Sequence, residues 1–426
     1  MRRVLVFGGV AALLVAAVAC AGSDEDDDVV APVDEGGSPT PEGGATRDAA
    51  IASDAAPDAR GNVCSSDGWC ETTLPNVGLT IKDIWPVEGH AFALAESRSF
   101  GIRVLEWSDA TSSWSYIDDN GANEQLSDYA TKIWAPSADE VYFAAAPGTI
   151  YHGVRPVAPA TAWTWTHEEL PAGHPSFGGA TRDLVLGVWG VGGEVFAWRT
   201  NTIARRSRGD GGAPRWEVEY TVDDSETPND TVHFIGAAGV RADDVVFYGY
   251  RLGARGTCDL AVRRSSEGYR RIADAVAPAS FGQVCAARDG MALLPGYASG
   301  ELSSQIETVD GSRFFILRPP LEILQLDLTG ESLVAERRSI PAIGHGSRWG
   351  TMWLESEERQ WLAGGGNLGA VLRAENIDDA DGGTYRYSST VLNGAPLSKR
   401  PLRIRGGSTS NLWAVGLDYA LHKTTP

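Results

Sequence analysis

A pattern of short segments that recurs about every 50 residues most constrains what this chain can fold into. The stretches TKIWAPSADEVYFAAAPGTIYHG and LRIRGGSTSNLWAVGLDYALHK share one order of features. A short alternating segment is followed by a turn, an aromatic-rich segment, a second turn and a third segment that ends near His152 or His422. The first segments of the copies have their anchors at Trp85, Trp134, Trp189, Ile235, Trp353 and Ile404. Self-similarity at a fixed period predicts a repeat architecture.

Complete copies add a fourth segment that contains tryptophan. These tryptophans are Trp114, Trp163, Trp165 and Trp216. Four segments with period-two alternation in each of seven copies predict an all-β fold, a single β-propeller of seven four-stranded blades. The interval from Ile235 to Trp353 has room for two copies, and the second of them, around MALLPGYAS and FFILRPPLEILQLDL, matches the pattern least well. Helix-period stripes are absent, which disfavours most other fold classes.

The last copy has no fourth segment, and the start of the repeat region supplies a matching one. GWCETTLPN, at Gly68 to Asn76, resembles the fourth segment WTWTHEELP. We therefore predict that Trp69 to Leu74 forms the outer strand of the seventh blade. Such a clasp would close the ring, whose first and last blades would otherwise be held together only by packing.

The N-terminus predicts export. A cationic start, MRR, precedes an apolar run to Ala19 that is shorter than the about 20 residues needed to span a bilayer. We therefore expect a signal peptide over residues 1–19. Ala17 to Cys20 resembles a lipobox, so cleavage would leave Cys20 as a lipidated first residue, and Ala21 after it suggests the outer membrane. The same residues also form an A-x-A cleavage site, and plain secretion is the alternative.

Residues 20–63 predict a lipidated cysteine followed by an acidic disordered tether. After Cys20, this segment has eleven carboxylates, two arginines and no aromatic residue, for a net charge of −9. It cannot bury enough apolar surface to offset the entropy of ordering the chain. All fourteen tryptophans lie in residues 64–426, the predicted β-propeller domain, which carries a net charge of −13. An acidic domain argues against a nucleic-acid partner.

Five cysteines are present, and lipidation of Cys20 would leave an even number, as an oxidising compartment favours. Of the three possible pairings, proximity along the chain favours Cys64–Cys70 and Cys258–Cys285. The first would pin the start of the clasp strand. The second would join the third strand of blade four to the start of blade five. A zinc site is the alternative, although the C-x5-C spacing does not suit a zinc knuckle.

The repeat I-W-x(5–8)-D-x-V/L-aromatic, the GWC…LP segment before it, the acidic tether and the lipobox together resemble a family of lipoproteins. These are the tandem-repeat propeller lipoproteins of myxobacteria and related soil bacteria, with WD40-like, kelch-like or sialidase-like repeats. The resemblance covers residues 1–30 and most of 64–426. It implies a propeller at the cell envelope, and it implies no site residues because its motifs specify architecture.

Several short motifs suggest chemistry, and each has a simpler structural explanation. His152 and His422 share one repeat position with two arginines, which favours packing over ligation. HEELPAGH, at residues 167–174, has proline where a metalloprotease helix needs its second histidine. DDADGG, at residues 378–383, lacks the later glutamate of a calcium loop, and RGD, at residues 208–210, lies in a basic hairpin tip. We therefore predict no catalytic, cofactor-binding or metal-binding residue and no cofactor.

The expected function is binding or scaffolding without catalysis, by a monomer at the periplasmic face or the cell surface. The partner would be a protein, a glycan or an envelope component, bound through loops, since rigid scaffolds usually present recognition on loops. The candidate loops are Asp118–Asp128, Val222–Thr231, Tyr297–Gly311 and Asn376–Gly383. The alternative is a carbohydrate-active propeller enzyme, a sialidase-like hydrolase or lyase. Carboxylates that converge on the central channel would favour the enzyme, and an apolar or plugged channel would favour the binding protein.

Overall fold

The computed structural model describes the propeller region of the chain in segments. The described residues are 63–119, 130–145, 148–171, 185–208, 214–223, 230–253, 256–277, 284–294, 305–318, 321–330, 332–342, 348–365, 369–377 and 383–425. All of them belong to the second of two compact units, Ala59–Pro426, whereas Met1–Asp58, with the predicted signal peptide, Cys20 and most of the tether, lies outside them. Within these segments, no helix is long and apolar enough to cross a membrane.

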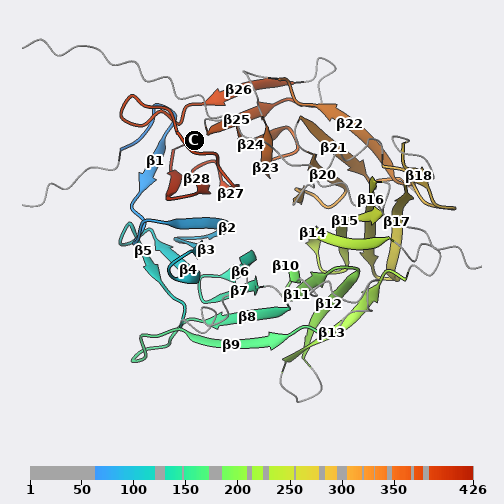
Figure 1. Cartoon of the computed structure of the whole chain (residues 1–426), viewed down its shortest axis with the longest axis horizontal. Helices are drawn as coiled ribbons and strands as arrows, with labels where there is room; N and C mark the ends of the chain where they lie inside the picture. The colour runs from blue at the N-terminus through green and yellow to red at the C-terminus, as the bar shows by residue number, and fades with distance from the viewer. Residues whose placement is uncertain are drawn as a thin grey trace, which may run out of the picture. The chain divides into compact units, whose positions relative to one another are not determined.

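Seven antiparallel sheets surround a central axis as the blades of a β-propeller, as predicted (Figure 1). The inner strands of blades one to seven are β2 (Leu79–Val87), β6 (Ala130–Ser137), β10 (Val185–Val191), β14 (Thr231–Arg241), β19 (Ile306–Thr308), β23 (Trp349–Leu354) and β27 (Arg403–Ser408). The second strands are β3 (His90–Ser97), β7 (Glu140–Ala145), β11 (Glu194–Arg199), β15 (Asp244–Gly253), β20 (Arg313–Arg318), β24 (Arg359–Gly364) and β28 (Asn411–Gly416). The predicted anchors all lie on inner strands.

The outer half of each blade follows in the same order. The third strands are β4 (Gly101–Ser108), β8 (Thr149–Val154), β12 (Thr202–Arg208), β16 (Gly256–Ser265), β21 (Glu322–Asp327), β25 (Ala370–Glu375) and β29 (Tyr419–Lys423). The outer strands are β5 (Ser113–Tyr116), β9 (Thr164–Glu169), β13 (Pro214–Thr221), β17 (Gly268–Val276), β22 (Val334–Ser339), β26 (Thr384–Ser388) and β1 (Trp69–Thr72). His167 of the HEELPAGH motif therefore lies on a strand, β9.

The N-terminal strand closes the seventh blade, which confirms the predicted clasp. β1 pairs antiparallel with β29, from Trp69 opposite Lys423 to Thr72 opposite Ala420. Figure 1 shows β1, at the blue end of the colour range, beside the red strands β27 and β28. The ring is closed on its inner side as well, since β2 contacts β27.

Packing between blades explains why the strands are so rich in aromatic and aliphatic residues. Second strands such as β7 and β28 are buried along nearly their whole length, because they have neighbouring strands on both sides and a neighbouring blade on each face. Glycine allows the closest approaches. A Cβ atom at Gly190 of blade three would lie 2.6 Å from the Trp134 ring of blade two, so the inner-strand tryptophan needs glycine opposite it.

Two details of blades four and five differ from the prediction. Blade four has a fifth strand, β18 (Ala286–Ala287), which pairs with β17. Blade five begins at β19, whereas Met291, at the start of the MALLPGYAS stretch, is outside the named strands. β19 has three residues and has Glu307 where four other blades have tryptophan, and both features weaken the repeat signal.

Candidate functional site

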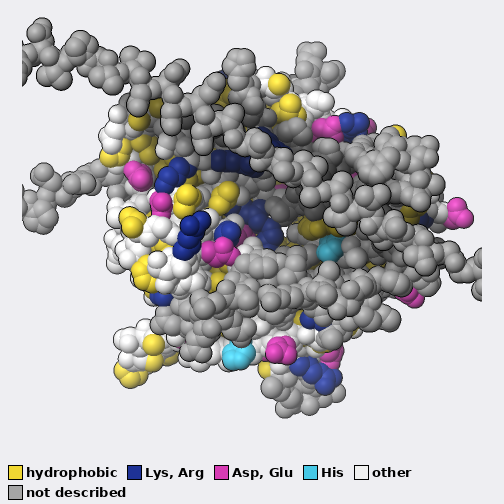
Figure 2. All heavy atoms as spheres, in the orientation of Figure 1, with side chains coloured by type: hydrophobic (Ala, Val, Ile, Leu, Met, Phe, Trp, Pro, Cys, Tyr) yellow, Lys and Arg dark blue, Asp and Glu magenta, His cyan; other side chains and the backbone are white. Residues whose placement is uncertain are grey.

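The centre of the ring is occupied by charged side chains from inner strands. The guanidinium group of Arg405, on β27 of blade seven, lies 4.2 Å from the centre of the Trp85 ring of blade one. Its Nη2 atom is 3.4 Å from Glu307 Oε1 of blade five. Arg405 of blade seven therefore contacts blade one, its neighbour, and also blade five, which is not its neighbour. Figure 2 shows lysine and arginine side chains gathered around the centre of this face.

A second buried arginine joins blade seven to blade one. Arg403 Nε is 2.7 Å from Asp83 Oδ1, and both residues are almost fully buried. The other oxygen of Asp83 accepts a hydrogen bond of 3.1 Å from the Ile133 backbone N–H of blade two. Burial raises the pKa of the Asp83 carboxyl, but nearby cations outweigh burial and hold this pKa below its usual value. Asp83 is thus the ion-pair partner of Arg403 in the structure.

Lys132 is the third cation near the channel. Burial, followed by the charge of Arg403, lowers the pKa of Lys132 to about 7. The two carboxylates of this region, Asp83 and Glu307, each face an arginine. The channel side of the described strands is therefore a network of paired charges.

Ion pairs also cross the seams between neighbouring blades. Six of the seven seams have an arginine of one blade against a carboxylate of the next. The pairs, from the first seam onward, are Arg155–Glu106, Arg206–Glu168, Arg264–Glu219, Arg318–Asp259, Arg313–Glu357 and, closing the ring, Arg403–Asp83. Such pairs fix the rotation of one blade against another, because breaking a buried one leaves an uncompensated charge.

The described residues of the seam between blades six and seven are joined mainly by hydrogen bonds. Arg373, on β25, pairs within its own blade, with Nη2 2.8 Å from Glu375 Oε1. Hydrogen bonds cross this seam instead: Trp69 Nε1–H donates to Ser388 Oγ at 2.9 Å, and the Ser389 N–H donates to Asp67 Oδ2 at 2.6 Å. The clasp is therefore joined to blade six by hydrogen bonds in which no cation takes part.

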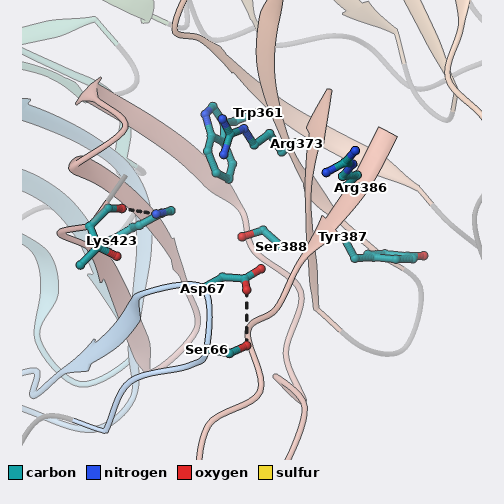
Figure 3. A pocket seen from close by; sticks show the side chains of 9 residues that line it. Ser66, Asp67, Trp361, Arg373, Arg386, Tyr387, Ser388 and Lys423 are labelled. Atoms are coloured by element: carbon teal, nitrogen blue, oxygen red, sulfur yellow. Dashed lines mark hydrogen bonds between the residues drawn. The ribbon is translucent and has the colours of Figure 1, made fainter. Parts of the chain in front are cut away.

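A cavity of about 320 Å³ lies at this seam, and we call it the seam pocket. Its lining comes from blade six, from the loop before β1 and from the end of β29. The lining residues are Ser66, Asp67, Trp361, Arg373, Arg386, Tyr387, Ser388, Lys423 and Thr425. Figure 3 shows Lys423 on one side of the pocket, Trp361 and Arg373 together on another, and Asp67 and Ser388 between them and Ser66.

Positive charge dominates the seam pocket. Arg373 lies 5.6 Å and Lys423 Nζ lies 6.0 Å from the centre of the same Trp361 ring, so blades six and seven each bring a cation to one ring. Lys423 is only 2 % exposed and donates to the Thr425 carbonyl oxygen. Burial, and secondly the charge of Arg373, lowers the pKa of Lys423, although the carboxylates of Asp67 and Glu355 act in the opposite direction. With Arg386, the lining has three cations and one carboxylate, Asp67.

The repeat position predicted to serve packing does so. His152 stacks on Tyr142 with ring centres 4.3 Å apart, and His422 stacks on Trp413 at 3.9 Å. Each histidine faces its aromatic partner across the strand pair. Arg373 faces Trp361 in the same way, but in blade six the position also lines the seam pocket. Packing is therefore only part of its environment.

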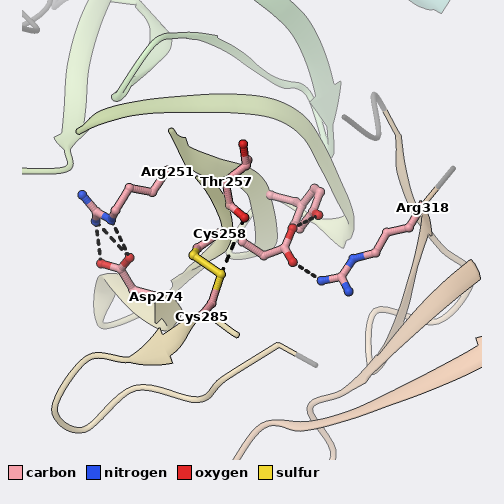
Figure 4. Close-up of a disulfide and its surroundings, with 8 residues drawn as sticks. Arg251, Thr257, Cys258, Asp274, Cys285 and Arg318 are labelled. Atoms are coloured by element: carbon pink, nitrogen blue, oxygen red, sulfur yellow. Dashed lines mark hydrogen bonds and ion pairs between the residues drawn. A yellow bond between two sulfur atoms is a disulfide. The ribbon is translucent and has the colours of Figure 1, made fainter. Parts of the chain in front are cut away.

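Both predicted cysteine pairs lie at disulfide distance. The Sγ atoms of Cys64 and Cys70 are 2.06 Å apart, at the start of the clasp, and those of Cys258 and Cys285 are 2.01 Å apart. Cys285 leads into β18, so the second pair joins two strands of blade four and does not reach blade five, contrary to the prediction. Two buried ion pairs, Arg251–Asp274 and Arg318–Asp259, flank it in Figure 4.

Much of the remaining predicted surface lies outside the described residues. This holds for Cys20, for most of the four candidate loops, for most of DDADGG and for the tip that carries RGD. Within the described segments, no group of three histidine, cysteine, aspartate or glutamate residues could hold a metal ion.

Comparison with known proteins shows the fold. No family model and no curated protein matches the sequence. Among solved structures, the chain is similar to the WD40 repeats of RRP9, with a TM-score of 0.53 and 10 % identity over 86 % of this chain and 99 % of that one. It is also similar to YCF48 from Cyanidioschyzon merolae, with a TM-score of 0.50 and 13 % identity over 84 % of this chain and 99 % of that one. The propeller domain of Cps50 (Swd1) from Myceliophteria thermophila has a TM-score of 0.50 and 9 % identity over 83 % of this chain and 99 % of that one.

Proposed function

We propose that this protein is an exported, lipid-anchored, non-catalytic binding protein of the bacterial outer membrane. Lipid on Cys20 would hold it at the periplasmic face or the cell surface, and the tether would separate the propeller from the membrane. The propeller would bind or scaffold an envelope component, protein or glycan. The propeller fold supports this role, because a rigid ring presents recognition surfaces in fixed positions.

The contrast between the channel and the seam pocket carries the proposal. The channel carboxylates Asp83 and Glu307 face arginines, and nearby charges keep the pKa of Asp83 low. Hydrolysis of a glycoside needs a carboxyl group with a raised pKa beside a second carboxylate. The seam pocket, by contrast, is a recess lined by cations that exceed its carboxylates in number. The charges of the channel and of the seam pocket therefore favour binding over hydrolysis at these two places.

The candidate loops stay part of the proposal as a surface for larger partners. They are Asp118–Asp128, Val222–Thr231, Tyr297–Gly311 and Asn376–Gly383. A protein partner would contact several of them, whereas a small ligand would enter the seam pocket.

Labelled palmitate tests the anchor. In a Gram-negative host, the full chain should take up the label and sediment with the outer membrane. A Cys20→Ser variant should lose both properties, because no thiol remains to carry lipid. A wild-type chain released unlabelled into the soluble fraction would support plain secretion and contradict the anchor.

A pull-down tests binding. Tagged protein in detergent-solubilised envelopes should capture the same partner repeatedly, whether protein or polysaccharide, and heat-unfolded protein is the control. Capture that is no better than the control would contradict the binding role. Depolymerisation of an envelope polysaccharide by the purified protein would contradict the absence of catalysis.

A further inference from the structure

We propose that the seam pocket binds a sugar residue that bears a carboxylate, with the carboxylate between Arg373 and Lys423. This inference rests on the proposed binding function and names the chemistry of one ligand.

The seams between the blades differ in how their charges are arranged. At six seams, a carboxylate of one blade faces an arginine of the next. At the seam between blades six and seven, the cations Arg373 and Lys423 stand over the same tryptophan ring, and Arg373 lowers the pKa of Lys423. Glu375 pairs with Arg373 inside blade six, and Asp67 and Glu355 partly offset the effect of Arg373 on Lys423, so a ligand carboxylate between the two cations would add an anion that bridges the blades. Guanidinium and ammonium groups both bind carboxylates through charge-assisted hydrogen bonds.

Several N–H donors of the seam pocket remain available to a ligand. An ammonium group has three N–H donors, and Lys423 uses one for the Thr425 carbonyl oxygen while it is almost fully buried. Arg373 Nε is buried and has no hydrogen-bond partner. Arg386, on the exposed outer strand β26, adds a guanidinium group at the edge of the pocket. These donors favour a ligand with a strong acceptor.

The rest of the lining favours hydroxyl groups on the same ligand. Asp67 already accepts hydrogen bonds from the Ser389 N–H and the Ser66 hydroxyl, and a carboxylate has further lone pairs for ligand hydroxyls. A pocket for a bare anion gains nothing from Asp67, because its charge opposes that of the ligand. Ser388, which accepts from Trp69, still has its own hydroxyl proton to donate. One carboxylate together with several hydroxyls describes an acidic sugar.

Size and rigidity agree with one sugar residue. A cavity of about 320 Å³ is at the small end of the range for ligand sites. Its cations come from strands β25, β26 and β29, and the Trp69–Ser388 bond holds the clasp against blade six. Sites built on strands hold their side chains in place better than sites on loops.

Saturation-transfer NMR and calorimetry with D-glucuronate, D-glucose and inorganic phosphate test the inference. The purified chain should bind glucuronate at least about tenfold more tightly than glucose or phosphate, since one charge-assisted hydrogen bond is worth about that much. Arg386→Gln, at an exposed position, should weaken glucuronate at least about threefold and leave folding intact. Arg215→Gln is the matched control, because Arg215 is an exposed arginine on the outer strand of blade three.

Each other result overturns the inference. Equal binding of glucose would show that the carboxylate is not recognised, and equal binding of phosphate would show a simple anion site. No binding of glucuronate, or equal loss in the Arg386 and Arg215 variants, would do the same. If the pull-down still captures its partner in any of these cases, the proposed function stands and only the sugar assignment fails.

Discussion

Removal of the Trp69 side chain tests whether the clasp closes the ring. Trp69 is 0 % exposed and packs among residues of blades six and seven. Its ring meets that of Trp361 edge to face with centres 6.1 Å apart, and its Nε1–H donates to Ser388 Oγ. Trp69→Ala would therefore remove core packing and the hydrogen bond together, where the closing strand packs against blade six.

The expected loss can be worked from these contacts. Truncation of a buried tryptophan to alanine costs about 3–5 kcal/mol, and an unmade hydrogen bond adds about 1 kcal/mol. We expect Trp69→Ala to lower the unfolding free energy by about 5 kcal/mol. With about 2 cal/mol/K of unfolding entropy per residue, the melting temperature of a domain of this length should fall by about 7 °C.

Urea denaturation followed by far-ultraviolet circular dichroism measures this loss. Ser388→Ala should cost about 1 kcal/mol in the wild-type background and much less in the Trp69→Ala background, since the bond is then already absent. Trp216→Ala, on the outer strand of blade three, is the matched control for packing alone. Hydrogen exchange should accelerate in β28 and β29 for Trp69→Ala but not for Trp216→Ala. A loss below about 1 kcal/mol for Trp69→Ala would refute the clasp as a stabilising element.

Buried charge and the second cysteine pair supply three further tests. Arg318→Met would leave the buried Asp259 carboxylate without its cation. Urea denaturation should then show an unfolding free energy lower by about 3–5 kcal/mol. A decrease below about 1 kcal/mol would contradict the stabilising role of the pair. The pKa of Lys132 is lowered to about 7 in the folded state, so above this pH the folded chain has released a proton that the unfolded chain keeps up to about pH 10. The unfolding free energy of the wild type should therefore rise with pH over this window, and that of Lys132→Met should lack the rise. Parallel pH profiles of the two proteins would contradict this expectation. Cys285→Ser opens a loop with a sequence separation of 27 and should cost about 3–4 kcal/mol, and unchanged urea midpoints would argue against a disulfide in the purified protein.

The repeat pattern was sufficient to predict the ring and its closure because each depends on local signals. Alternation marks the strands, and Trp85 and Trp134 mark equivalent inner positions that recur at one spacing. Blade five was hard to place because its inner strand is short and lacks that tryptophan. The added strand β18 also escaped prediction, since two alanines carry no strand signal.

The seam pocket could not be predicted from the sequence, because its cations have different neighbours along the chain and meet only when the ring closes. Asp67 and Arg373 are about 300 residues apart, and the closing strand pair brings them to one cavity. Arg373 does stand at the repeat position of His152 and His422, which the sequence pattern predicts to serve packing. The cross-strand stacking on Trp361 agrees with that assignment but does not reveal the second cation.

The position of the pocket follows from how a propeller is closed. Five seams join blades that are each formed by consecutive strands, and at such a seam an arginine of one blade can meet a carboxylate of the next. Both seams of blade seven border on β1: Trp114 of blade one donates to Thr72, and the contacts with blade six are hydrogen bonds from Trp69 and to Asp67. Lys423, opposite Trp69 in the strand pair, then lies across the seam from Arg373, whose charge lowers the pKa of Lys423, whereas the charges of Asp67 and Glu355 raise it. Repulsion between two partly buried cations lowers stability, and an anion bound between them would reverse the sign of that interaction.

A ligand of the seam pocket should therefore raise the unfolding free energy, and most of this gain should disappear in Trp69→Ala if the clasp positions the pocket. An equal gain in both proteins would show that the ligand binds elsewhere.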